Sequence, residues 1–154
     1  MKNKLILIAV LLICAIPTFA QKDKHENKEQ MRKEMLQMKL DFLAADMELK
    51  EDQKKQFDEL YSQMESERRA VLKKMKKAEK AISQNKNASE ADYEKATQDI
   101  SDARAEMVQI EKRYDEKFST FLSKKQMFKM KEAENKFMQK MQDIRHKKKS
   151  EKKK

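Results

Sequence analysis

The chain has 154 residues, of which 42% are charged and 6% aromatic, and its net charge is +10. It contains no Gly, and its only Pro and Cys are Pro17 and Cys14. Beyond these positions the usual turn residues of hairpins and phosphate loops are missing, and neither a disulfide framework nor thiol chemistry can be built. The composition is typical of long amphipathic helices and not of a thick globular core.

Residues 1–20 have the pattern of a cleaved signal peptide. A positively charged start precedes an apolar run at 5–16, and Thr18 and Ala20 supply small residues where a signal peptidase reads. The run is shorter than the roughly 20 residues that span a bilayer. We therefore expect cleavage before Gln21 and export, with a retained membrane anchor as the alternative.

The exported chain stays basic, since loss of Lys2 and Lys4 lowers the net charge only from +10 to +8. An exported protein seldom meets nucleic acid, so we expect no nucleic-acid partner. Unfolded polypeptides and anionic lipid headgroups are the partners that we expect for a basic exported chain. We expect the Lys-rich tail at 146–154 to be disordered and solvated. The more specific alternative is that it makes weak electrostatic contact with an anionic membrane surface.

Hydrophobic periodicity predicts four helices in one domain at 29–145, after a flexible lead at 21–28. The first helix has a broad apolar face at 31–47, and we expect it to be the shortest, with four or five turns. The second begins near Lys50 and carries a heptad seam at 57–82, in which apolar positions alternate steps of four and three.

The last two helices follow short breaks in the pattern. The second helix ends at 85–87, where we expect an Asn in the left-handed conformation because Gly is absent. The third begins after Ser89, a preferred N-cap residue, and carries a seam at 93–121. The fourth carries a seam at 127–144 in steps of three and four.

Seams of this kind bury only a narrow stripe on each helix. We therefore expect an all-α fold of four helices, arranged as an elongated thin layer that completes its burial by forming a homodimer. Arg68 and Glu134 interrupt the seams of the second and fourth helices. We expect them to approach each other or to face an open groove, because an uncompensated buried charge is costly.

Two short segments repeat one pattern, a Leu followed four residues later by a Gln. In Leu122–Gln126, Ser123 and Gln126 form a capping box: the Ser hydroxyl accepts from the backbone N–H of the Gln, whose side chain reaches back to the cap N–H. In Leu49–Gln53 the cap position is Lys50, which has no acceptor. We expect both segments to start helices, the second soundly capped and the first weakly.

These segments resemble the two L-T-x-x-Q motifs that define the exported Spy/CpxP-type chaperones. The second copy reads L-S-K-K-Q with Ser123 in place of Thr, and the first reads L-K-E-D-Q and departs at Lys50. The resemblance covers 31–144 and includes the helix order and the signal peptide. It implies a periplasmic chaperone that needs neither ATP nor a cofactor, a cradle-shaped antiparallel dimer that binds unfolded or partly folded envelope proteins on a concave basic surface and limits their aggregation.

Basic residues on the second and third helices are the candidates for client binding. Long Lys and Arg side chains combine charge with apolar stems, and Met adds a soft, adaptable surface. The alternative is that these are ordinary solvated faces beside a coiled-coil seam. The candidates are Arg68, Arg69, Lys73, Lys76, Lys77, Arg104, Lys112 and Arg113.

We expect neither enzymatic activity nor a metal site. The carboxylates are interleaved with Lys at helical spacing, as on any solvated helix, and His25 and His146 lie at opposite ends of the chain. Three Met pairs place thioethers suited to Cu(I) on one helical face, but packing in the apolar seams explains them more simply. The pairs are Met35/Met38, Met127/Met130 and Met138/Met141.

Two other functions remain open beside that of a chaperone. One is a metal-responsive or stress-sensing regulator of the same fold that binds the outer domain of a sensor protein. The other is a structural coiled-coil protein without clients. Suppression of client aggregation in the absence of nucleotide distinguishes the chaperone from both.

Overall fold

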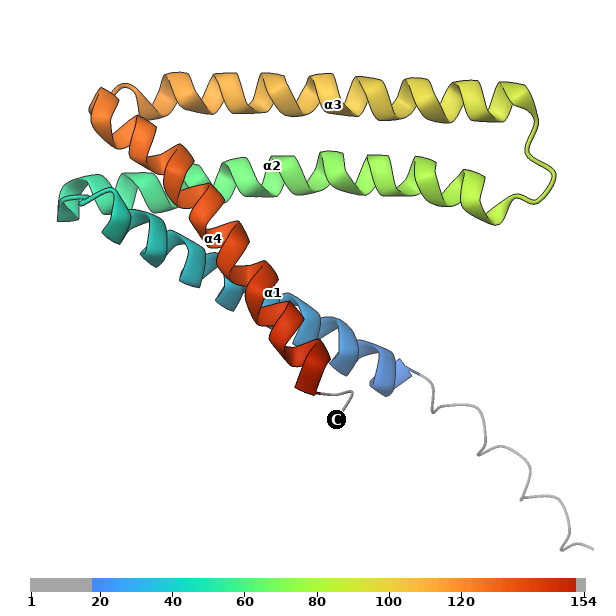
Figure 1. Ribbon diagram of the computed structural model, residues 1–154, viewed down its shortest axis with the longest axis horizontal. Coiled ribbons are helices and arrows are strands. Elements are labelled where there is room, and N and C mark those ends of the chain that lie inside the picture. The colour runs from blue at the N-terminus through green and yellow to red at the C-terminus, as the bar shows by residue number, and fades with distance from the viewer. Residues whose placement is uncertain (1–17, 152–154) are drawn as a thin grey trace, which may run out of the picture. The chain divides into compact units, whose positions relative to one another are not determined.

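The computed structural model describes residues 18–151, with the side chains of 26–147 and of 150 and 151. Most of the expected signal peptide, at 1–17, lies outside the described residues. The described residues form four helices and no strand, which confirms the all-α class (Figure 1). The helices are α1 (Thr18–Asp46), α2 (Glu51–Gln84), α3 (Glu90–Phe118) and α4 (Lys124–Glu151).

The chain divides into two parts, residues 1–38 and 39–154. In the first part the described residues belong to α1, and Met31, Met35 and Met38 are exposed there. The second part contains the last turns of α1 together with α2, α3 and α4. Every buried hydrophobic residue of the described chain belongs to this second part, so the core lies there.

α1 is longer than the sequence predicts. It includes 21–28, the segment expected to be a flexible lead, and its 29 residues equal those of α3. The expectation of a shorter first helix is therefore wrong. The polar segment lacks Gly and Pro, and Lys, Glu and Gln favour helix. A further turn along, Gln30 Nε2 donates to Glu34 Oε1 at 2.9 Å, a spacing that stabilises helices.

In the second part, α2 and α3 lie side by side as an antiparallel hairpin (Figure 1). Three ion pairs cross between them: Arg68 with Glu111 at 3.5 Å, Lys74 with Glu106 at 2.8 Å, and Arg113 with Glu67. Between these levels the seam is apolar, with Val71 only 1% exposed. The pairs therefore define which turn of α2 lies opposite which turn of α3.

The core lies where α4 and the last turns of α1 meet the hairpin. Its centre is aromatic: the ring of Phe118 lies 5.5 Å from that of Phe57 and 6.4 Å from that of Tyr61, measured between centroids. All three residues are fully buried. α1 and α4 meet through Phe42 and Phe137, whose rings are 5.7 Å apart. Burying each large side chain contributes about 1.5–3 kcal/mol, so this cluster is the main source of stability.

The left-handed conformation occurs at the end of α1 and not at the end of α2, where the sequence predicts it. At the end of α1, the N–H of Leu49 donates to Ala44 O at 3.0 Å, and Glu48 is left-handed with φ of 55°. At the end of α2, Asn85 is extended, and its side chain accepts from the N–H of Asn87 at 3.0 Å. The expected left-handed Asn is thus wrong, because an Asx turn closes α2 instead.

α4 continues to Glu151, beyond the domain end expected at 145. Residues 146–151, expected to be disordered, are therefore helical. Ser150 Oγ donates to Lys147 O at 2.7 Å within this stretch. The physical reason is that Lys has a good helix propensity and that cations near a helix C-terminus interact favourably with the helix dipole.

Candidate functional site

Ser123 caps α4 as the sequence predicts. The backbone N–H of Gln126 donates to Ser123 Oγ at 3.2 Å, and the backbone N–H of Ser123 donates to Gln126 Oε1 at 3.0 Å. These two bonds are the reciprocal pair of a capping box. Leu122, just before the cap, is 5% exposed, so the chain enters α4 directly from the core.

α2 begins with only half of this arrangement. The backbone N–H of Lys50 donates to Gln53 Oε1 at 3.2 Å, but the Lys50 side chain makes no capping hydrogen bond. An ammonium group has donors and no acceptor. Leu49, the first residue of this motif, is half-buried. The expected inequality of the two helix starts is confirmed.

Substitutions at the two caps should have opposite effects on stability. Ser123→Ala removes the acceptor for the N–H of Gln126 and should lower the free energy of unfolding by about 0.5–2 kcal/mol. Lys50→Thr supplies the missing acceptor and should raise it by about 0.5–1 kcal/mol. Urea unfolding followed by circular dichroism measures both. A shift of both variants in the same direction would contradict the capping argument.

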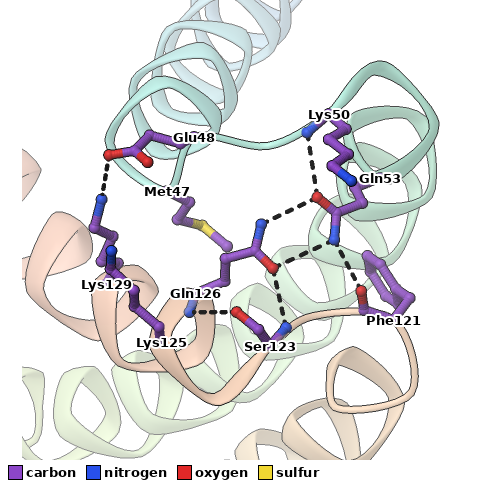
Figure 2. Close-up of a pocket in the computed structure, with 9 residues that line it drawn as sticks. All are labelled: Met47, Glu48, Lys50, Gln53, Phe121, Ser123, Lys125, Gln126 and Lys129. Carbon is purple, nitrogen blue, oxygen red and sulfur yellow. Dashed lines mark hydrogen bonds and ion pairs between the residues drawn. The ribbon is translucent and has the colours of Figure 1, made fainter.

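The two motif glutamines hydrogen-bond to each other (Figure 2). Gln126 Nε2 donates to Gln53 Oε1 at 3.0 Å, and Gln53 Nε2 donates to Gln126 Oε1 at 3.3 Å. Gln53 Nε2 also donates to the carbonyl of Phe121 at 2.9 Å. Because each Oε1 accepts as well from the cap N–H of its own helix, one amide pair joins the starts of α2 and α4.

Loss of either glutamine should destabilise the fold, and the two losses should not add. Gln53→Ala or Gln126→Ala removes a hydrogen-bond partner from the remaining half-buried amide and should cost about 1–3 kcal/mol. The double variant should lose less than the sum, with a coupling energy of about 0.5–3 kcal/mol. Urea unfolding of the four proteins gives this coupling. Additive losses would show that the contact contributes nothing of its own.

An open pocket of about 410 Å³ surrounds the amide pair (Figure 2). Three of its lining residues are basic: Lys50, Lys125 and Lys129. Lys129 Nζ lies 2.6 Å from Glu48 Oε1, and this hydrogen bond, together with the charges of Lys129 and Lys125, lowers the pKa of the Glu48 carboxyl. The amides of Gln53 and Gln126 in this pocket already hydrogen-bond to each other and to the cap N–H groups of α2 and α4.

A polar cluster surrounds Glu134 where α4 meets the hairpin. Tyr61 OH donates to Glu134 Oε1 at 2.5 Å, and a guanidinium nitrogen of Arg68 lies 3.6 Å from the same oxygen. This confirms the expected approach of Arg68 and Glu134. Arg68 also pairs with Glu65 and Glu111. Burial, reinforced by the charge of Glu134, raises the pKa of Tyr61, so its phenol stays a hydrogen-bond donor.

The structure divides the eight client-binding candidates into two groups. Arg68 belongs to the polar cluster and Arg113 pairs with Glu67, so both connect helices. The other six form no ion pair within the described residues, and five of them are exposed while Arg69 is half-buried. These six are Arg69, Lys73, Lys76, Lys77, Arg104 and Lys112.

Four of the unpaired cations flank exposed apolar side chains. On α2, Leu72 is 46% exposed and lies one turn from Arg69 and one turn from Lys76. On α3, Val108 is 49% exposed and lies one turn from Arg104 and one turn from Lys112. We call these six residues the hairpin patch: Arg69, Leu72, Lys76, Arg104, Val108 and Lys112. Sequence reasoning found the cations but missed the two apolar residues, because both lie outside the seams.

The two stripes of the hairpin patch lie on one face of the hairpin. Leu72 is one turn beyond Arg68, and Val108 is one turn before Glu111. The ion pair of Arg68 and Glu111 crosses between the helices on that face. Residues one turn apart share a side of a helix, so Leu72 and Val108 lie on the side of this ion pair.

Methionines occupy both buried and exposed positions. Met130 is fully buried, and Met127 and Met141 are half-buried. Core packing does not account for three others, contrary to the interpretation from sequence; these are Met35, Met38 and Met138, all exposed. Within the described residues, no group of three His, Cys, Asp or Glu is arranged to hold a metal ion.

In the part of the chain that the structure describes, no helix has both the length and the apolar character needed to cross a membrane. Comparison of the chain with protein-family models, with curated proteins and with solved structures finds no match. Functional inference for this protein therefore depends on its own residues and geometry.

Proposed function

We propose that this protein is an exported, ATP-independent chaperone that binds unfolded or partly folded proteins and limits their aggregation. The observation that carries the proposal is the hairpin patch, in which an exposed apolar side chain on each helix lies between two unpaired cations. Non-native chains expose apolar side chains and acidic groups without a fixed geometry, which suits such a surface. The resemblance of Leu122–Gln126 and Leu49–Gln53 to the motifs of Spy/CpxP-type chaperones supports the same function.

The chemistry of the hairpin patch suits loose and reversible binding. Its four cations attract acidic segments over a distance of about 8–10 Å at physiological salt, and their alkyl stems extend the apolar contact of Leu72 and Val108. Each contact is small, because burial contributes only about 25 cal/mol per Å² of apolar surface. Clients held in this way can dissociate and fold without nucleotide hydrolysis.

The same proposal includes a periplasmic location and a homodimer. The leader at 1–20 would direct export. A second copy would present a second hairpin patch, so that one client chain contacts both and binds more tightly than to either alone.

Light scattering by an aggregating client tests the proposal. The chain that begins at Gln21 should suppress aggregation without ATP at a few-fold molar excess. The variant Leu72→Gln/Val108→Gln should lose most of this activity, because it keeps all cations and removes both apolar contacts. Circular dichroism should show unchanged helix content, since both side chains are exposed.

The matched control is Phe128→Gln on α4, which removes a 65% exposed apolar side chain outside the hairpin patch. It should suppress aggregation as well as the unchanged chain does. Failure of the unchanged chain to suppress aggregation would refute the chaperone function. Equal losses in the control and in the double variant would refute the role of the hairpin patch.

A further inference from the structure

The two halves of α4 differ in how many of their basic side chains form ion pairs. In the first half, Lys124 and Lys125 form no ion pair with any described residue, and the other three of the five lysines pair with carboxylates of α1, of α3 and of the turn after α1. They are Lys129, Lys131 and Lys136, with N···O distances of 2.6, 2.9 and 3.2 Å. From residue 137 onward, the described basic side chains form no ion pair; they are Lys140, Arg145 and Lys147.

Exposed apolar side chains accompany this uncompensated charge. Met141 and Ile144 follow Phe137 by four and seven residues and so continue its stripe along the helix. Exposure rises along this stripe, since Phe137 is 6% exposed, Met141 is half-buried and Ile144 is 38% exposed. Met138, beside the stripe, is 58% exposed. The apolar face of α4 thus continues beyond the core, among unpaired cations.

The helical conformation makes these features one surface. α4 is unbroken from Lys124 to Glu151, so the cations and the apolar stripe are held on a helix anchored in the core at Phe137. The sequence of 137–154 contains eight Lys or Arg and only two acidic residues, Asp143 and Glu151. We call residues 138–147 the α4 tail.

We propose that the α4 tail binds the surface of an anionic lipid bilayer. The interface of a bilayer accepts apolar side chains at the acyl boundary and cations among the headgroups, which is the combination found here. Each Lys or Arg near such a surface contributes about fivefold in affinity. A soluble polypeptide of acidic residues alone, such as polyglutamate, would compensate the charge and leave the apolar stripe in water. The proposal does not rest on the chaperone function, because the α4 tail shares no residue with the hairpin patch.

Cosedimentation with lipid vesicles tests this surface. The chain from Gln21 is the suitable form, because the apolar run at 5–16 would itself insert into lipid, and no buried side chain of the described residues precedes Leu40. It should bind vesicles of phosphatidylglycerol and phosphatidylcholine and should not bind phosphatidylcholine alone. Arg145→Gln/Lys147→Gln should weaken binding by roughly 30-fold.

The control Lys131→Gln/Lys136→Gln changes the net charge by the same amount at paired lysines of the same helix. It should weaken binding by less than about fivefold, since these cations are already compensated. Equal weakening by the two variants would overturn the proposal, because binding would then follow net charge alone. Circular dichroism of both variants distinguishes lost binding from lost structure.

The apolar part of the surface has its own test. Met138→Gln/Ile144→Gln keeps the charge and should weaken vesicle binding by about tenfold, since two partly exposed apolar side chains no longer enter the interface. Soluble polyglutamate should compete poorly with the vesicles. Binding that is unaffected by this variant, or polyglutamate that binds as tightly as the vesicles, would overturn the assignment to a bilayer.

Discussion

Phe118→Ala should lower the free energy of unfolding by about 3–5 kcal/mol. Phe118 ends α3 and is fully buried among four other aromatic rings. Centroid distances to these rings are 5.5 to 6.4 Å, and the neighbours are Phe57, Tyr61, Tyr114 and Phe121. Because they belong to α2, α3 and the turn before α4, they cannot all move inward to fill the cavity.

Urea unfolding measures this loss. A small domain has a total stability of about 5–15 kcal/mol, so the variant should show a large shift of its midpoint. Phe128→Ala is the matched control, because it removes the same side chain from a position that is 65% exposed. It should change the stability by no more than about 0.5 kcal/mol. Similar losses in the two variants would mean that the aromatic cluster is not the core.

Glu134→Ala should lower the free energy of unfolding by about 1–3 kcal/mol. The main loss is at Tyr61, whose hydroxyl belongs to a fully buried residue and would have no acceptor in place of Glu134 Oε1. Arg68 should add little, because it keeps its pairs with Glu65 and Glu111. The cost is thus that of a buried donor left without a partner.

A second variant distinguishes this cause from loss of packing. Tyr61→Phe/Glu134→Leu removes donor and acceptor together and should recover most of the lost stability, since replacing both partners by apolar groups is nearly neutral. Glu132→Ala, at an exposed position of the same helix, should have little effect. Losses that simply add in the double variant would show that the hydrogen bond is not what stabilises α4 on the hairpin.

Errors in the prediction from sequence concentrate at the ends of the chain. Charge and polarity there suggested a flexible lead at 21–28 and a disordered tail at 146–154, yet α1 includes the lead and α4 reaches Glu151. A low content of apolar residues means that a segment cannot bury itself, and this favours disorder. It does not prevent helix where Lys, Glu and Gln have good helix propensity and no Gly or Pro interrupts the chain.

The candidate site was predictable only in part. The capping box at Ser123 and the missing acceptor at Lys50 were visible, since capping involves residues three apart. The division of the cations into paired and unpaired ones was not visible. Arg113 has its partner at Glu67, 46 residues away in the sequence, and only the register of the hairpin brings the two together.

The sequence by itself determined the all-α class, the starts of α2, α3 and α4, and the inequality of the two motif caps. All of these depend on interactions within one or two turns, which periodicity and capping residues record directly. Only the tertiary structure decided that Gln53 and Gln126 form one amide pair across 73 residues, and that Leu72 and Val108 share a face. Both depend on how distant helices pack, a relation that no local pattern in the chain specifies.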